Sequence, residues 1–455
     1  MKSFFLFFII VPLFLPLFFY KLGQTSLISW DEAWYATVAR NIVKSEDYIN
    51  LTWNGHPYFD HPPAGYWLMA LTYKIFGINE FWTRFPSALA GIISIALLYL
   101  LGKKLFNPLV GLSSAISLTS ATWFIFRSRT GNLDIILTMF FLLSILLGLM
   151  ASEKKKYLLF LAISLALLLL TKTMVPLAII PTLIIIFYKK NTFLWKDLMI
   201  PILIFSITGL GWFIIQIIQN PGYIQHYFSI GLKEVNLQST YLANFKLTKD
   251  YLYYGIGRWF WPSILSLILS TIFRQKRFFI LMVFFISFIL PTIFSPKVQI
   301  WYLIPLFPIL FLSYFGLTYI ILEKYFHKLR YYLYAIVLLF SSLIYFSQVK
   351  MIWYQFIDIP AFVSDEAILS KEAGKYPQQL LVDGDFAPAA LFYSEKDRVD
   401  KAPIKQEEFI ALLNSKDEFL LITNNWRVEN FNLLEKNYQI LKKDRDKILI
   451  LHTIN

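Results

Sequence analysis

An acidic pair, Asp31-Glu32, follows the first apolar run of the chain, residues 4–20, and offers the first side chains that could do chemistry. A carboxylate in such a place can accept a proton from a hydroxyl or orient it for attack. Acidic pairs are also common at helix starts, where they complement the helix dipole. A second pair, Asp365-Glu366, shows that the dipeptide alone is not specific. Spacing therefore leaves both interpretations of Asp31-Glu32 open.

A second candidate is Asp134, the only acidic residue between Glu80 and Glu153. It lies close in sequence to Arg127 and Arg129, at the start of an apolar run. Carboxylates at membrane depth are costly and are usually paired or functional. Asp134 is therefore either half of a structural Asp–Arg pair or a second active-site carboxylate.

Other polar residues give weaker signals. Lys172 interrupts an apolar stretch and has the same two interpretations, whereas His56 and His226 fit ordinary loop histidines. The chain has no cysteine, and no set of His, Asp and Glu has the spacing of a metal site. A few carboxylates could still hold a divalent metal, but spacing does not support one, and no other cofactor is predicted.

The segment around Asp31 is predicted to be a helix lying in the membrane interface. Trp34, Val38 and Ile42 follow one another at intervals of four, which gives a narrow apolar stripe. Downstream, residues 61–63 (His-Pro-Pro) should be extended, and a second short helix should begin directly after them. Two interfacial helices joined by a polar loop are not needed merely to connect two membrane spans.

Membrane helices must position these segments. Hydrophobic residues make up 57% of the chain and charged residues 16%, with a mean hydropathy of +0.56. Soluble domains carry roughly a quarter charged residues. The runs lack the alternation of barrel strands, so the fold class is all-α and polytopic. About eleven spans are predicted, near residues 4–20, 82–101, 108–126, 135–151, 157–171, 174–188, 197–218, 252–272, 278–295, 299–322 and 331–348.

The basic residues predict the orientation. Residues 1–349 contain 28 Lys and Arg against 12 Asp and Glu, whereas residues 350–455 contain 14 against 17. The positive excess thus lies in short loops between spans, which argues against nucleic-acid binding. These loops share a side with Lys2, and the positive-inside rule assigns that side to the cytoplasm. We therefore expect a multi-pass protein of the plasma (inner) membrane with a cytoplasmic N-terminus and an extracytoplasmic tail.

The tail, residues 350–455, is predicted to be a small soluble α/β domain that follows a transmembrane domain at 1–349. Residues 379–385, 418–425 and 447–453 have the pattern of short strands, and residues 431–438 that of a helix. About 100 residues is an ordinary domain size. The mixed charges of the tail fit a solvated cap or a partner-binding module.

Three motifs, in order, resemble the start of the protein O-mannosyltransferase and lipid A aminoarabinose transferase superfamily (ArnT-like and PMT proteins). They are WDEAWYATVAR at 30–40, YFDHPPAGYWLMA at 58–70 and FGINEFWTRFPSALAG at 76–91. Weaker matches follow at RTGNLDIILT, LLTKTMVPLAII, GRWFWP and SPKVQIWYLIPLFP, so the resemblance covers about the first 310 residues. The superfamily consists of multi-pass glycosyltransferases of the GT-C architecture, and the tail resembles no assignable part of it.

The resemblance implies a glycosyltransferase that moves a sugar from a polyprenyl phosphate to an acceptor at the outer face, with inversion. The acceptor would be a protein hydroxyl, lipid A or another glycolipid; neither it nor the sugar is specified by the sequence. The implied catalytic residues are Asp31, Glu32 and Asp134. The implied donor-phosphate residues are His61, Arg129, Lys233, Arg258, Lys297 and Tyr302, with Tyr58, Tyr66, Arg84 and Lys172 in support. The family usually has Lys at the position of His61, whose charge depends on pH.

Two other functions stay open. A transporter or lipid flippase is compatible with the number of spans, but it predicts hydropathy repeats and paired broken helices near the midplane. No such symmetry is visible in the sequence, and the polar cluster lies at the predicted outer interface. A non-catalytic scaffold would depend on its tail and would not need Asp31.

Overall fold

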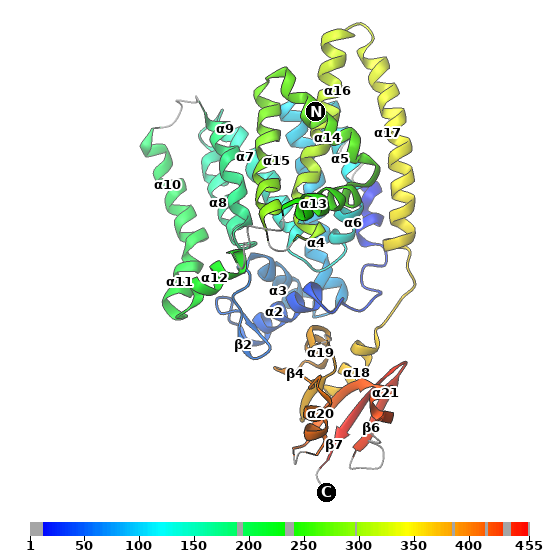
Figure 1. The fold of residues 1–455 in the computed structure, drawn as a ribbon. Coiled ribbons are helices and arrows are strands. Elements are labelled where there is room, and N and C mark those ends of the chain that lie inside the picture. Colours follow the sequence, from blue (N-terminus) through cyan, green and yellow to red (C-terminus); the bar gives the residue numbers. More distant parts are fainter. Residues whose placement is uncertain are drawn as a thin grey trace. The chain divides into compact units, whose positions relative to one another are not determined.

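The computed structural model describes residues 12–188, 194–232, 241–295, 298–384, 387–414, 417–430 and 438–453 (Figure 1). Two compact units divide the chain. The membrane unit comprises Met1–Tyr20, Phe59–Gly65 and Phe85–Ile359, and the sheet unit comprises Lys21–Tyr58, Tyr66–Arg84 and Pro360–Asn455. The domains predicted at 1–349 and 350–455 stay a prediction.

Long apolar helices make the chain a multi-pass membrane protein. Among the described residues, seven helical stretches are long and apolar enough to cross a membrane. They are α4 (Glu80–Leu105), α7 (Asp134–Ala151), α10 with α11 (Trp195–Phe205 and Gly211–Gln219), α13 with α14 (Tyr241–Ile256 and Phe260–Ser270), α15 (Lys276–Phe294), α16 (Phe307–Tyr325) with the 3₁₀ segment Ile300–Leu306, and α17 (Arg330–Ile352) with the π-helical turn Trp353–Ile357.

The other predicted spans are shorter or broken. The run at 108–126 is a pair of helices, α5 (Pro108–Leu118) and α6 (Thr122–Ser128), bent by 69° at their junction. The runs at 157–171 and 174–188 contain α8 (Tyr157–Leu169) and a helical stretch that ends in α9 (Ile179–Phe187). The run at 4–20 lies partly outside the described residues. Among the described residues the number of candidate spans is seven, or eight if the bent pair is counted as one span. The total of eleven spans stays a prediction.

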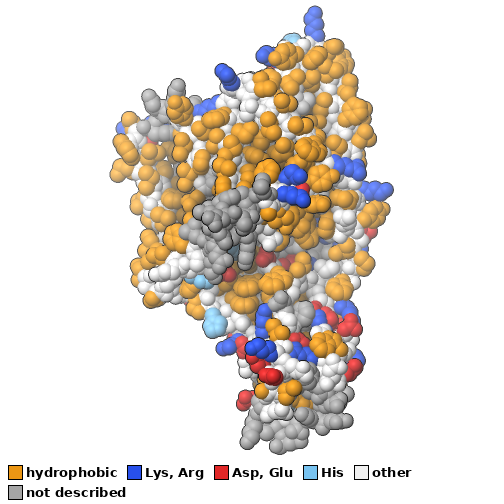
Figure 2. Space-filling model, in the orientation of Figure 1, with side chains coloured by type: hydrophobic (Ala, Val, Ile, Leu, Met, Phe, Trp, Pro, Cys, Tyr) orange, Lys and Arg blue, Asp and Glu red, His pale blue; other side chains and the backbone are white. Residues whose placement is uncertain are grey.

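The helices of the membrane unit differ in how much of their surface is covered. The most apolar windows of α7 and of the stretch that contains α16 are 78% buried, whereas those of the stretches with α10 and α17 are 11% and 17% buried. In Figure 1, α10 and α17 lie at opposite edges of this unit. Hydrophobic side chains cover most of the visible face of its helices in Figure 2, as expected for a surface in contact with lipid.

The N-terminal part of the sheet unit contains the helix α2 (Asp31–Ser45) and a short hairpin, β1 (Thr52–Trp53) and β2 (His56–Pro57). The hairpin turn is Asn54-Gly55, and both residues have positive φ, at 54° and 76°. This is the conformation that favours Asn-Gly in two-residue turns. A helix begins shortly after the His-Pro-Pro sequence, as predicted: α3 (Ala64–Phe76).

The C-terminal residues form a five-stranded mixed sheet in the order β4-β3-β5-β7-β6. The strands β4, β3 and β5 are parallel, and β7 pairs with β5 and β6 in antiparallel register. Strands and helices here are β3 (Gln379–Val382), β4 (Val399–Lys401), β5 (Phe419–Asn424), β6 (Tyr438–Asp444), β7 (Lys447–His452), α18 (Asp365–Ala373), α19 (Ala387–Ser394), α20 (Gln406–Leu413) and α21 (Asn425–Asn430). Three predicted strands are confirmed as β3, β5 and β7; the helix predicted at 431–438 lies almost entirely outside the described residues.

Candidate active site

Asp134 is the centre of a buried charged cluster in the membrane unit. Its Oδ2 accepts a hydrogen bond from Arg127 Nη2 at 2.6 Å, and its Oδ1 accepts one from Lys172 Nζ, also at 2.6 Å. All three side chains are buried. Ion pairs at this depth are maintained only when close geometry offsets the loss of solvation. The carboxylate therefore has fixed cations on both oxygens.

Aromatic rings flank both cations of this cluster. The Arg127 guanidinium lies 4.9 Å from the ring centre of Trp301, and the Lys172 ammonium lies 4.9 Å from that of Tyr302. Cations are attracted to aromatic faces, more strongly where water is excluded. Both rings come from the 3₁₀ segment Ile300–Leu306, so the cluster joins α6, α7 and this segment with the turn that follows α8.

The local sequence explains why Asp134 begins a helix. Asn132 Oδ1 accepts a hydrogen bond from the Asp134 backbone N–H at 2.9 Å, and the Asn132 amide donates to the carbonyl of Thr130 at 2.8 Å. Asparagine often ends a turn and opens a helix in this way. Asp134 also places a negative charge at the positive end of α7, which is favourable.

His61 lies beside this cluster and forms a hydrogen bond with Thr173. Its Nδ1 is 3.0 Å from Thr173 Oγ1, and that hydroxyl donates to the carbonyl of Asp60 at 2.8 Å. Since the hydroxyl proton is used there, Nδ1 is the donor in its contact with Thr173 Oγ1. Burial, reinforced by the Lys172 ammonium, lowers the pKa of His61 to about 3. His61 is therefore not a cation at physiological pH.

Arg129 is occupied by carbonyl groups of the membrane unit. Nη2 donates to Tyr20 O at 2.7 Å, Nη1 to Leu17 O at 3.2 Å and Nε to Phe356 O at 3.3 Å. The side chain is buried. This guanidinium thus connects residues 17 and 20 with the π-helical turn after α17.

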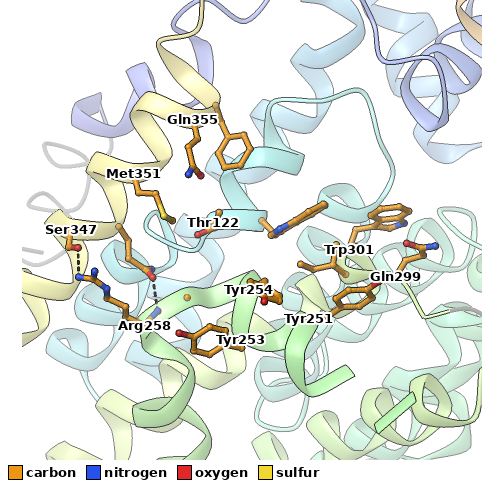
Figure 3. Close-up of a pocket in the computed structure, with 15 residues that line it drawn as sticks. Thr122, Tyr251, Tyr253, Tyr254, Arg258, Gln299, Trp301, Ser347, Met351 and Gln355 are labelled. Carbon is orange, nitrogen blue, oxygen red and sulfur yellow. Dashed lines mark hydrogen bonds between the residues drawn. The ribbon is translucent and has the colours of Figure 1, made fainter. Parts of the chain in front are cut away.

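Arg258 is the predicted phosphate residue that faces an open cavity. The cavity has a volume of about 920 Å³ and lies in the membrane unit (Figure 3). Arg258 donates from Nη1 to Ser347 Oγ, and its side chain is otherwise exposed. Lys233 and Lys297, which were predicted to serve the same role, lie outside the described residues.

In the sheet unit, Glu32 forms a buried ion pair with Arg84. Arg84 Nε donates to Glu32 Oε1 at 2.8 Å and Nη2 donates to Oε2 at 3.0 Å, and both side chains are 3% exposed. Glu32 Oε2 also accepts from the Ile28 backbone N–H at 2.8 Å. A two-point pair of this kind holds the start of α2 in place, so Glu32 anchors this helix.

Asp31, the neighbouring residue, is the first residue of α2 and is half-buried. The predicted supporting residues Tyr58 and Tyr66 are buried, with their hydroxyl oxygens 3.0 Å apart. The ring of Tyr35, one turn after Asp31, meets the ring of Tyr66 edge-on at 5.6 Å. The sheet unit therefore holds Asp31 at the N-terminal end of α2, one turn before a tyrosine that packs against the pair Tyr58 and Tyr66.

The geometry thus divides the predicted site residues. Asp134, Lys172, Tyr302 and His61 lie together in the membrane unit, whereas Asp31, Glu32 and Arg84 lie in the sheet unit with Tyr58 and Tyr66. Sequence reasoning noted Arg127 only as a neighbour of Asp134 and missed Thr173 and Trp301. Within the described ranges, no three His, Asp or Glu side chains are grouped as metal ligands.

Comparison with known proteins supports the resemblance drawn from the motifs. Residues 60–217 match the family model for dolichyl-phosphate-mannose-protein mannosyltransferase. An undecaprenyl phosphate-alpha-4-amino-4-deoxy-L-arabinose arabinosyl transferase of Pseudomonas savastanoi pv. phaseolicola is 34% identical over 127 residues, 28% of this chain and 24% of that protein. An uncharacterized protein of Aquifex aeolicus is 35% identical over 161 residues, 35% of this chain and 32% of its own. The matched part thus spans about a quarter to a third of these relatives.

Similarity to solved structures covers far more of the chain than similarity in sequence does. The crystal structure of ArnT from Cupriavidus metallidurans bound to undecaprenyl phosphate matches with a TM-score of 0.74 at 14% identity, over 98% of this chain and 97% of ArnT. The oligosaccharyltransferase AglB of Archaeoglobus fulgidus, in complex with an inhibitory peptide and a dolichol-phosphate, matches with a TM-score of 0.60 at 11% identity, over 92% of this chain and 69% of AglB. The predicted GT-C resemblance is therefore confirmed at the level of the fold.

Proposed function

We propose that this protein is a glycosyltransferase that moves a sugar from a polyprenyl-phosphate-linked donor to an acceptor at the outer face of the membrane. The observation that carries the proposal is the agreement in fold with ArnT over nearly the whole of both chains. The local match to the mannosyltransferase family over residues 60–217 supports the same reaction class. Fold alone does not specify function, so the side chains must supply the chemistry.

In the proposed reaction, an acceptor oxygen attacks the anomeric carbon of the donor sugar. The new carbon–oxygen bond forms as the bond to the phosphate oxygen breaks, so the configuration inverts. The acceptor proton passes to a carboxylate, for which we propose Asp31. The electron pair of the broken bond leaves with the polyprenyl phosphate.

The departing phosphate gains negative charge, and fixed cations would stabilise it. Lys172 and Arg127 fit this role because both are held rigidly by Asp134. Asp134 would then act by positioning these cations. Tyr302 stacks on Lys172 and has a hydroxyl that could donate to the same phosphate. The neutral state of His61 argues against a charged contact there, although Lys is usual at this position of the family.

The direct test is release of polyprenyl phosphate by the full-length protein in lipid nanodiscs, supplied with an undecaprenyl-phosphate sugar and candidate acceptors. Asp31→Asn should lower the release rate by at least about 100-fold, within the range typical for loss of a general base. Its thermal stability should match that of the wild type. Wild-type protein that releases nothing with protein, lipid A and other glycolipid acceptors would overturn the proposal.

Arg84→Lys with Glu32→Asp provides a matched control in the same unit. Both changes keep the charges but break the two-point geometry, so stability should fall. If Asp31→Asn instead lowered stability as much as this pair and left turnover intact, Asp31 would be a structural residue.

A further inference from the structure

The cavity beside Arg258 is lined by residues of α6, α13 and α17, of the 3₁₀ segments Gly257–Trp259 and Ile300–Leu306, and of the π-helical turn Trp353–Ile357, all in the membrane unit. At about 920 Å³ it has the size of a small-molecule site. In Figure 3, Arg258 and Trp301 lie on opposite sides of the cavity, with Tyr254 between them.

Irregular backbone shapes this cavity at several points. Gly257 has φ +60°, and a Cβ there would come within 1.8 Å of Gln348 Oε1, so only glycine fits. Gln348 Oε1 in turn accepts from the Arg258 backbone N–H at 2.7 Å, and its amide donates to Ser120 O at 2.7 Å. The π-helical turn Trp353–Ile357 adds two lining residues; such turns within helices often occur at functional sites.

The lining has a distinct chemical character. Of the described residues that line it, Arg258 is the one charged side chain; the others include three tyrosines, two tryptophans and three glutamines. The Thr122 hydroxyl oxygen is buried and has no hydrogen-bond partner among the described residues, on a side chain that is 6% exposed. One fixed guanidinium suits one phosphate, while aromatic faces and amides suit a neutral sugar ring. An unpartnered hydroxyl is costly unless a ligand pairs with it.

The cavity borders both lipid-facing surface and the Asp134 cluster. Tyr254 is 62% exposed and Met351 38% exposed, and both are on stretches that are candidate membrane spans. On its other side, Trp301 lines the cavity and also faces the Arg127 guanidinium. A ligand could therefore keep an apolar tail in the lipid and bring its head group next to the cluster.

We propose that this cavity binds the head group of a phosphorylated glycolipid, with the phosphate on Arg258, the sugar against the aromatic wall and a hydroxyl or phosphate oxygen on Thr122. The proposal rests on the transferase function, since that reaction supplies two lipids with this chemistry. One is the polyprenyl-phosphate sugar, and the other is a phosphorylated acyl glycolipid acceptor.

The test is binding by full-length protein in nanodiscs, measured by native mass spectrometry with three probes. These are undecaprenyl phosphate, an acylated glucosamine phosphate and the same glycolipid without its phosphate. Arg258→Gln should weaken at least one phosphate probe about tenfold or more and change the third probe less than twofold. Arg258→Lys should recover part of the loss, and Arg330→Gln, at the opposite end of α17, should change none of them.

A loss confined to undecaprenyl phosphate would support the proposal with the donor as occupant, and a loss confined to the glucosamine phosphate would support it with the acceptor. Equal weakening of all three probes, or of none, would overturn it. Thr122→Val keeps the size of the side chain and removes an unpartnered hydroxyl, so the fold should tolerate it. We expect it to weaken the same probe as Arg258→Gln by about threefold, and an unchanged affinity would remove Thr122 from the site. Release of polyprenyl phosphate by the wild type, measured separately, decides the transferase proposal.

Discussion

At the scale of single residues, the two carboxylates of the Asp31-Glu32 pair have different surroundings although they are adjacent. Glu32 is held by Arg84 and by a backbone N–H, with both of its oxygens used. Asp31 begins the helix and is half-buried. A family motif that contains both residues can thus combine an anchoring residue, Glu32, with a second carboxylate at the start of the helix, for which we propose the catalytic role.

Asp134→Asn should test how strongly the buried ion pairs stabilise the protein. The change leaves Arg127 and Lys172 buried without their shared carboxylate, which typically costs roughly 3–5 kcal/mol. We expect a clear fall in thermal unfolding temperature, and we expect the double variant with Lys172→Met to be less destabilised than the sum of the two single changes. Additive effects of the two changes would mean that the pair is not coupled.

His61 yields a prediction about pH. Its pKa is lowered to about 3 in the folded protein, against about 6.5 in an unfolded chain. The unfolded state therefore takes up the proton first as the pH falls below 6.5, and the contribution of His61 to stability is present above that pH and decreases below it. Unfolding monitored between pH 7.5 and 4.5 should show a smaller loss of stability in His61→Asn than in the wild type, and an equal loss would contradict the assignment.

At the scale of elements, breaks in the helices build the cavity. The bend between α5 and α6 brings Ser120 to Gln348, and Gly257 ends α13 with a positive φ against the same glutamine. These contacts depend on a few backbone positions with unusual conformations, which the apolar composition of the runs does not reveal.

Gly257→Ala tests this arrangement. The added methyl group meets Gln348 Oε1, and φ +60° is unfavourable for alanine, so we expect a loss of roughly 1–3 kcal/mol. Gly211→Ala is a suitable control, because a Cβ there has no atom within 4 Å. It should be neutral or slightly stabilising within its helix. A thermal unfolding scan of both variants provides the measurement. Equal unfolding temperatures would show that Gln348 can move away from the added methyl group at little cost in stability.

Sequence patterns predicted the elements well where periodicity is strong. The apolar runs from 82–101 onward are helical, and three buried strands of the tail were found from their aliphatic residues. The edge strand β6 was missed because YQILKKD is half polar and none of its side chains is fully buried, so it has no aliphatic run typical of a core strand. The Glu32–Arg84 pair was missed because 52 residues separate its partners, and no local spacing signals a contact of that range.

At the scale of the whole molecule, the sheet unit depends on its last strands. The strand β7 lies between β5 and β6 and pairs with six residues of β5. Its aliphatic residues lie in both layers of the core, with Leu449 on one face and Ile450 on the other. A chain that ends at residue 437 would expose β5 on one edge and lose part of both layers.

We therefore expect a protein truncated after residue 437 to be cleaved within residues 360–430 by a protease that leaves the full-length protein intact. Exposed strand edges and missing core make this unit open readily. Digestion in nanodiscs followed by mass analysis is the measurement. A protected tail in the truncated protein would show that β4, β3 and β5 are sufficient for its stability.

The three carbonyl contacts of Arg129 bear on how the protein is made. Two of them come from residues 17 and 20 and the third from residue 356, so their acceptors are synthesised more than 300 residues apart. The ring of Trp353 also stacks on that of Tyr20, with centres 5.5 Å apart. While the ribosome is still translating the middle of the chain, Arg129 can already meet residues 17 and 20, but Trp353 and Phe356 have not yet been made. This group of contacts in the membrane unit is therefore completed only after residues 353–356 have been synthesised.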